Sequence, residues 1–282
     1  MSQQTRRVAM VNSDGKSAPV IVDPPGVETT LHELRFRVLA RTAYEHVFTE
    51  LGTLDAAERA LAEGCDVVYV DTFGDYAVDR IRALTSVPVV GAGEAGIRSA
   101  AEHHGSYSIV TVWPRSMRYL YDERLATTPG GERCRGVHHL SDDDELERLG
   151  RRDGVKARMN RHESDVVADL AALCRSAVAA DGSEAVLLGC TCMSPVAEAI
   201  RERIEVPVLD PSTIGLETAH RAALASASPV STSSASGDVR HAGLAVDVVE
   251  AYLRAQEKDS VWVDDCEVCA ITRVTVAKEE QE

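Results

Sequence analysis

Two stretches of the chain repeat one pattern of apolar and polar positions. Each begins with an acidic residue, continues as an apolar run that ends at a polar residue, and leads through a helical segment to a Val-Pro-Val run. The first copy occupies about residues 66–91 with its polar end at Thr72, and the second occupies 184–209 with its polar end at Cys190. A short unbroken apolar run is typical of a strand buried on both faces. Each copy therefore predicts a strand, a crossover helix and a second parallel strand.

The repeat predicts the fold class and the place of the site. In parallel sheets the functional groups lie at the carboxyl ends of the strands. Two copies that face each other would therefore place Thr72 and Cys190 on opposite walls of one cleft. We predict an α/β fold of two similar domains with parallel sheets flanked by helices, related by a pseudo-two-fold axis, with the active site in the cleft between them.

The predicted organisation divides the chain into three parts. The first α/β lobe takes residues 1–105 plus 211–225, the second takes 106–210, and residues 226–282 form a linker, a C-terminal helix and a tail. The other predicted elements are a strand ending at Asn12, a strand over 29–36, a helix over about 37–63 broken near Gly52 with Thr53 as a cap, a helix start at Ser141, a helix over about 157–180 and a last helix from about Leu244.

Bulk composition narrows the classes of partner. The 282 residues carry a net charge of −15, which argues against nucleic acid or an anionic membrane, because both require a concentrated basic face. No apolar run approaches the ~18–20 residues that span a bilayer, and the N-terminus has no apolar signal-peptide region. Seven cysteines, an odd number, predict a reducing cytoplasm rather than a disulfide framework.

Cys190 is the leading candidate for chemistry. It follows an apolar run and precedes a helix that we predict to begin near Ser194. The positive end of a helix lowers the pKa of a nearby thiol, and the thiolate can take a proton from carbon, return one, or attack an electrophile. The alternative is that Cys190 is a small buried residue at a strand end. Cys192 is expected to pack in the turn, although its spacing from Cys190 also allows a redox or metal pair.

Several motifs carry a resemblance to a known family. They are the Leu-Gly-Cys-Thr run at 188–191 with Met193, the Val-Pro-Val-Leu-Asp-Pro run at 206–211, the Phe-Gly-Asp run at 73–75 and the Val-Pro-Val-Val-Gly-x-Gly-Glu run at 87–94. With these motifs most of residues 8–220 resembles the aspartate/glutamate/hydantoin racemase superfamily, and the hydantoin racemase branch most closely. The resemblance implies two similar α/β domains, a cofactor-free site between them, and two cysteines that act on opposite faces of the substrate's α-carbon.

The chain departs from the family pattern at one of these two cysteines. Cys190 matches the second, whereas Thr72 stands where the first is expected. A hydroxyl is a far weaker acid than a thiol, but it can relay a proton if Asp71 or Asp75 assists. The main hypothesis is a cofactor-independent racemase or epimerase of an amino-acid-like or hydantoin-like carbon acid, with Cys190 and Thr72 as the catalytic pair. A one-sided decarboxylase, a cis–trans isomerase, and a catalytically silent binding protein stay open as alternatives.

The resemblance also implies the residues that hold the substrate, a small carboxylate or hydantoin-like molecule. They are Asn12, Ser13, Phe73, Gly74, Thr111, Arg115 and Thr191. No metal is expected, because Cys266 and Cys269 have the spacing of a metal knuckle but no second Cys/His pair follows them. That no cofactor is needed is what the resemblance implies. The C-terminal part leaves open a homo-oligomer in which the tail packs on a neighbouring subunit.

Overall fold

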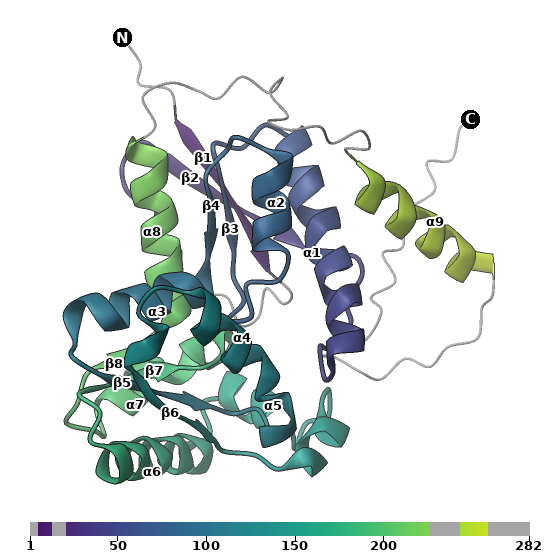
Figure 1. The fold of residues 1–282 in the computed structure, drawn as a ribbon. Helices are drawn as coiled ribbons and strands as arrows, with labels where there is room; N and C mark the ends of the chain where they lie inside the picture. Colours follow the sequence, from purple (N-terminus) through teal and green to yellow (C-terminus); the bar gives the residue numbers. More distant parts are fainter. Residues whose placement is uncertain (1–4, 13–20, 226–242, 259–282) are drawn as a thin grey trace, which may run out of the picture.

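The computed structural model describes residues 5–12, 21–225 and 243–258 and contains, within these residues, two four-stranded parallel sheets (Figure 1). The first sheet has the order β2-β1-β3-β4 and consists of β1 (Arg6–Asn12), β2 (Val27–Glu33), β3 (Val67–Val70) and β4 (Val89–Gly91). The second has the order β6-β5-β7-β8 and consists of β5 (Tyr107–Thr111), β6 (Cys134–His139), β7 (Ala185–Leu188) and β8 (Val208–Leu209). The second order is the first with every number raised by four. The predicted α/β fold with two similar parallel sheets is therefore confirmed.

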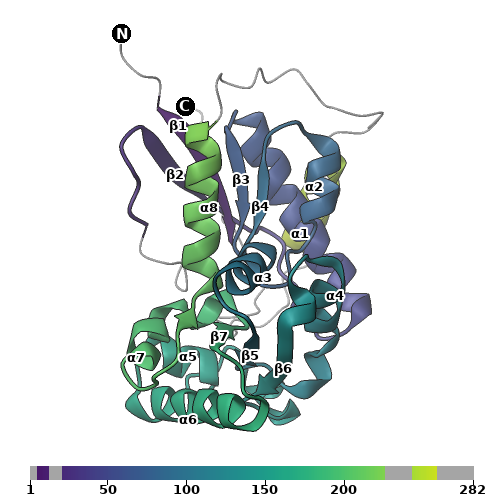
Figure 2. The same ribbon diagram turned by 60° about the vertical axis from the view of Figure 1, so that its left-hand side comes forward.

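Helices cover both faces of each sheet (Figure 2). The α-helices of the described residues are α1 (Ala43–Ala62), α2 (Val78–Leu84), α3 (Ala92–His103), α4 (Tyr119–Thr127), α5 (Val155–Asn160), α6 (Ser164–Asp181), α7 (Ala197–Arg201), α8 (Pro211–Ala225) and α9 (Leu244–Lys258). Successive side chains of a strand point to opposite faces, so Val68 packs toward α1 and α2 while Tyr69 packs toward α8. Burial on both faces explains why the strands read as unbroken apolar runs.

Two helices are exchanged between the sheets. α3 follows β4 of the first sheet but packs on the second, where Ile97 contacts Leu187 in a buried cluster. α8 follows β8 of the second sheet but packs on the first, where Leu216 lies in one cluster with Tyr69. α3 and α8 also contact each other (Figure 2). This exchange ties the two sheets together and fixes how their strand ends face each other.

α1 begins later than predicted and continues without a break. Thr42 caps it in a reciprocal capping box: the Thr42 side chain accepts from the N–H of Glu45, and the Glu45 carboxylate accepts from the N–H of Thr42. Gly52 and Thr53 both lie inside the helix, so the predicted break and the predicted cap at Thr53 were wrong. Gly52 is needed for a close approach instead, because a Cβ there would lie 2.1 Å from the carbonyl oxygen of Phe36.

Other predicted elements differ in detail from the structure. The helix predicted over about 157–180 is divided into α5 and α6, because His162 adopts a left-handed conformation with a φ of 54° between them. The helix start predicted at Ser141 is a 3-10 helix over Asp143–Arg148, and Thr191–Val196 is also 3-10 before α7 begins. The last helix is confirmed as α9, which packs on α1.

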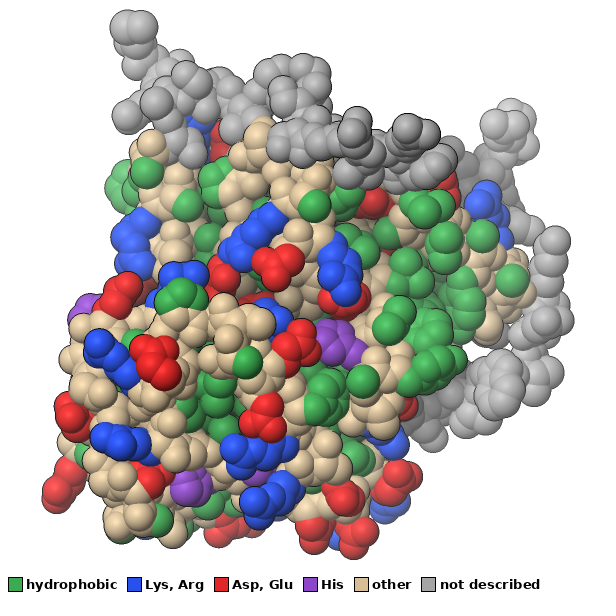
Figure 3. All heavy atoms as spheres, in the orientation of Figure 1, with side chains coloured by type: hydrophobic (Ala, Val, Ile, Leu, Met, Phe, Trp, Pro, Cys, Tyr) green, Lys and Arg blue, Asp and Glu red, His purple; other side chains and the backbone are tan. Residues whose placement is uncertain are grey.

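The surface is mixed in charge. Figure 3 shows acidic and basic side chains interspersed over one face, with hydrophobic side chains gathered near α1 and α9. Tyr44 and Val47 of α1 and Val248 of α9 are exposed. In the described ranges, no helix has both the length and the apolar character needed to cross a membrane. Cys266 and Cys269 lie outside the described residues, as does most of the predicted tail.

Candidate active site

The polar ends of both repeat copies reach the wall of one pocket. Thr72 follows β3 and Cys190 follows β7, and these two strands hold equivalent places in the two sheets. Phe73, Gly74 and Thr191 line the same pocket. The structure thus brings these predicted site residues together at the carboxyl ends of the strands.

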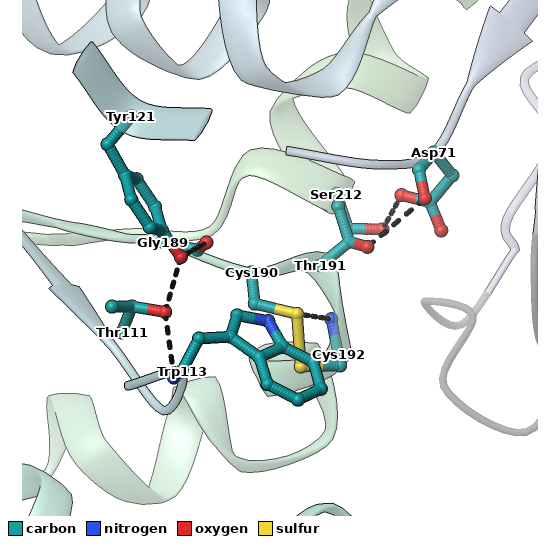
Figure 4. The surroundings of a disulfide bond; sticks show 9 residues. All are labelled: Asp71, Thr111, Trp113, Tyr121, Gly189, Cys190, Thr191, Cys192 and Ser212. Atoms are coloured by element: carbon teal, nitrogen blue, oxygen red, sulfur yellow. Dashed lines mark hydrogen bonds between the residues drawn. A yellow bond between two sulfur atoms is a disulfide. The ribbon is translucent and has the colours of Figure 1, made fainter. Parts of the chain in front are cut away.

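A hydrogen bond joins the two loops that carry Thr72 and Cys190. Thr191 donates its hydroxyl to the backbone carbonyl of Asp71 at 3.1 Å. The buried Asp71 carboxylate in turn accepts from the hydroxyl groups of Tyr69 at 2.8 Å and Ser212 at 2.6 Å. Burial, and then the charge of Asp71, raise the pKa of Tyr69, so this hydroxyl remains a donor. Figure 4 shows Asp71 with Thr191 and Ser212 beside the cysteines; the bond from Thr191 fixes the two loops against each other.

A buried tyrosine holds the backbone that precedes Cys190. Tyr121 of α4 donates its hydroxyl to the carbonyl of Gly189 at 2.9 Å and lies 2.6 Å from the hydroxyl of Thr111. Burial raises the pKa of Tyr121, which keeps it protonated as a donor. Thr111 is therefore part of the support behind the cysteine, and it does not line the pocket.

The sulfur of Cys190 is joined to Cys192 in a disulfide, and the indole of Trp113 lies beside the pair (Figure 4). The prediction that Cys192 merely packs in the turn was wrong, because its sulfur is bonded to that of Cys190. The N–H of Cys192 also points at the Cys190 sulfur at 3.1 Å. A disulfide sulfur carries no proton, so acid–base chemistry at Cys190 requires the reduced pair.

The hydroxyl of Thr72 has no hydrogen-bond partner in the described part of the chain, although its oxygen is buried. The two carboxylates considered as helpers are bonded elsewhere. Asp71 accepts from Tyr69 and Ser212, and Asp75 accepts from backbone N–H groups. An assisted relay through either carboxylate is therefore not present, and a substrate or water group would satisfy the Thr72 hydroxyl.

Asp75 anchors the Thr72 loop to the first turn of α3. Its carboxylate accepts from the N–H of Gly93 at 2.8 Å and from the N–H of Glu94 at 2.7 Å, and Asp75 itself has a φ of 48°. Burial, followed by the charge of Glu94, raises the pKa of Asp75 to about 7, against the opposing effects of the Gly93 N–H and of Arg124. The carboxyl is thus a pH-sensitive part of the loop that carries Thr72.

The Asp75→Asn variant is expected to differ from wild type in a pH-dependent way. The pKa of Asp75 is higher in the folded than in the unfolded state, so its contribution to stability is full below about pH 4 and is lost as pH rises through about 7. Urea unfolding measures the free energy of unfolding of both proteins at pH 5 and at pH 8. From pH 5 to pH 8 the value for wild type should fall by about 1 kcal/mol or more relative to the value for Asp75→Asn. If the difference in free energy of unfolding between wild type and Asp75→Asn is the same at both pH values, or changes in the opposite direction, the two N–H donors stabilise the charged carboxylate more than burial destabilises it.

Some predicted substrate-binding residues lie elsewhere. Arg115 lines a separate hollow with His138 and Asp142 and does not reach the pocket of Cys190. Asn12 is the last residue of β1, beside the end of β3, and Ser13 lies outside the described residues. Arg115 and Thr111 are therefore not part of the site that we propose below.

Several residues that line the pocket could not be predicted from the sequence. They are Arg37, Tyr76, Trp113, Lys156 and the apolar side chains of Leu34, Val38, Leu39, Ala40, Met117 and Leu120. They come from loops, from the 3-10 turn at Arg115–Met117, and from α4 and α5, and none belongs to a motif. No cluster of three or more His, Cys, Asp or Glu side chains in the described ranges is arranged to hold a metal ion.

Fold and pocket together define a class of enzyme, in which two parallel α/β sheets of one topology meet around a site with a cysteine on one wall. Residues 8–219 match the family model described as Asp/Glu/hydantoin racemase. The chain therefore belongs to the Asp/Glu/hydantoin racemase family and is an isomerase of the racemase type.

A relative agrees with this assignment, and solved structures share the fold. A hydantoin racemase of Paenarthrobacter aurescens is 27% identical over 204 residues, which cover 72% of this chain and 81% of the relative. The fold is similar to that of an allantoin racemase from Klebsiella pneumoniae, with a TM-score of 0.63 and 22% identity over 77% of this chain and 87% of the other. A mutant of arylmalonate decarboxylase has a TM-score of 0.53 and 21% identity, over 79% of this chain and 94% of the other. The two structural similarities concern the fold alone.

Proposed function

We propose that the protein racemises or epimerises an amino-acid-derived or hydantoin-like carbon acid without a cofactor, with Cys190 as one acid–base group and Thr72 on the opposite wall. The observation that carries the proposal is that these two residues, at the ends of equivalent strands, line one pocket of a chain from a racemase family. The relative named as a hydantoin racemase supports the choice of substrate class.

The surroundings of Cys190 suit proton transfer once the pair is reduced. The N–H of Cys192 points at the Cys190 sulfur, and a donor to the thiolate stabilises the charged form. The thiolate would take the proton from the substrate carbon, and the electron pair would pass to the adjacent carbonyl group. Inversion then requires a proton on the opposite face, where the Thr72 hydroxyl, which has no partner among the described residues, or a water that it holds, can supply it.

One observation favours a one-sided reaction as the second candidate. The Thr72 hydroxyl has no carboxylate bonded to it in the described part of the chain, so nothing there increases its acidity or basicity. If the Thr72 side delivers no proton, Cys190 alone would protonate the intermediate and only one enantiomer would form. That outcome corresponds to decarboxylation of a malonate-type substrate, or to cis–trans isomerisation if Cys190 acts as a nucleophile.

A heavy-water assay tests the proposed function. Single enantiomers of 5-substituted hydantoins and amino-acid derivatives are incubated with the reduced protein, and NMR and optical rotation are followed together. A racemase introduces deuterium at the reacting carbon while optical activity decays. Exchange without loss of optical activity supports the one-sided reaction, and binding without exchange supports a silent binding protein.

The Thr72→Cys variant is expected to raise the rate of racemisation by about 100-fold, because a thiol is the stronger acid and general acid–base groups contribute about 10²–10⁴-fold. The rates of exchange from the two enantiomers should also become more nearly equal. The measurement is the same heavy-water assay on the reduced variant. Thr72→Ser keeps the hydroxyl and should retain the wild-type rate. Unchanged rate and stereochemistry in Thr72→Cys would show that residue 72 does not face the reacting carbon.

A further inference from the structure

The pocket differs in charge from the rest of the protein. The chain has a net charge of −15, yet Arg37 and Lys156 are the charged side chains among the described residues that line the pocket, and no Asp or Glu lines it. The Arg37 guanidinium also donates within its own segment, to the Leu34 carbonyl at 2.9 Å and to the Glu33 carboxylate at 3.2 Å. Lys156 is 8% exposed, so its charge lies in the interior.

The fold holds Lys156 beside the cysteine loop. α5 begins at Val155, whose N–H donates to the buried carboxylate of Glu145, and α5 packs against the 3-10 segment that starts at Thr191. Lys156 has interactions within the protein. An ammonium group has three N–H donors, so it can keep a protein partner and still donate to a bound anion. Lys156 therefore lines the same pocket as Cys190, on a helix that packs against the segment after Cys190, where it can act on a bound ligand.

Most of the other side chains that line the pocket are apolar or aromatic. The segment between β2 and α1 contributes Leu34, Val38 and Leu39, and the 3-10 turn and helix after β5 contribute Met117 and Leu120. The close approach of Phe36 to Gly52 holds the first of these segments against α1. An apolar wall of this kind fits a hydrocarbon or aryl substituent on the substrate and offers few partners for a polar one.

We propose that the substrate is an anion with an apolar or aryl substituent and no free ammonium group, such as an N-acylated or N-carbamoylated α-amino acid. The reaction of this substrate rests on the proposed function, whereas the preference of the pocket for an anion concerns binding and can be tested by itself. A free amino acid would bring an ammonium into a pocket whose described lining has no carboxylate to pair with it. Removing the α-proton of a carboxylate adds a second negative charge, which the Lys156 ammonium would stabilise. A neutral hydantoin carries no charge when it binds, so the Lys156 ammonium would stabilise its complex less.

Three ligands with the same benzyl substituent separate the possibilities: N-carbamoylphenylalanine is an anion, 5-benzylhydantoin is neutral and phenylalanine is a zwitterion at pH 7. Calorimetry on the reduced full-length protein should show that the carbamoyl anion binds about 10-fold more tightly than the hydantoin and that phenylalanine binds most weakly. Lys156→Met should weaken binding of the anion by about 10- to 100-fold and leave the hydantoin almost unchanged. Lys156→Arg keeps the charge and should retain most of the preference.

The result that overturns the proposal is tightest binding of the hydantoin or of phenylalanine, equal weakening of all ligands in Lys156→Met, or no binding of the anion. Because Lys156 is buried, thermal unfolding checks that the Lys156→Met variant is folded. Arg37→Met provides a second variant, which should also weaken binding of the anion. Deuterium exchange is measured separately on the same ligands. If the anion binds with the predicted preference and no exchange occurs, the proposed reaction fails while the charge preference stands.

Discussion

Replacing Cys190 with alanine is expected to lower the rate of deuterium incorporation at the reacting carbon by about 1,000-fold or more. A positioned acid–base group contributes about 10²–10⁴-fold, and the sulfur of Cys190 takes part in both directions of a racemisation. The loss should appear in turnover rather than in binding, because alanine removes the proton carrier and leaves the pocket wall in place. NMR in heavy water on the reduced variant measures the rate, and calorimetry measures the affinity.

A buried cysteine elsewhere provides the matched control. Cys65 lies in the cluster between the first sheet and α1 and does not line the pocket. Burial raises the pKa of its thiol to about 11, so it is protonated and inert at neutral pH. Cys65→Ala should lower stability and leave the rate per folded molecule unchanged. If folded Cys190→Ala keeps more than about a tenth of the wild-type rate, Cys190 is not the acid–base group under either the racemase or the one-sided reaction.

The sequence predicted those parts of the fold that depend on local burial. β3 and β7 are buried along their whole length, so their apolar runs mark them as inner strands even without the structure. β6 could not be found in this way. It lies at the edge of its sheet, Val137 is its one buried residue, and the remaining positions mix polar and apolar side chains. Its existence depends on pairing with β5, which no short stretch of sequence encodes.

The candidate site was predictable where the repeat specifies it. Thr72 and Cys190 follow equivalent strands, so the internal symmetry of the chain is sufficient to bring the two together. Lys156 was not predictable, because a single lysine in a short helix has no periodic partner and its position depends on the Glu145 bond to Val155. The apolar wall before α1 depends in the same way on a contact between residues distant in sequence, the Phe36 carbonyl over Gly52.

The disulfide predicts a large loss of activity on oxidation. Protein in which Cys190 and Cys192 are joined is expected to catalyse racemisation about 100-fold or more slowly than the reduced protein. Forming the bond removes two protons and two electrons from the thiols, so the oxidised Cys190 sulfur can neither hold nor accept a proton. Treatment with dithiothreitol reverses this, because its thiolate attacks one sulfur and releases the other as a thiolate while the reagent becomes a cyclic disulfide. Cys190 is half-buried at the pocket wall, whereas Cys192 is 5% exposed, so attack at Cys190 is the accessible route.

Cys192→Ser separates this effect from general damage by oxidation. The variant keeps Cys190 and the backbone N–H that points at its sulfur, but it cannot form the pair. Its rate should therefore equal that of reduced wild type and should change little when dithiothreitol is added or withheld in air. Mass mapping of alkylated peptides reports in parallel whether Cys190 and Cys192 are free or joined. Full activity of wild type in which the peptides are joined would remove Cys190 from the reaction. An equal need for reductant in Cys192→Ser would place the sensitive bond elsewhere.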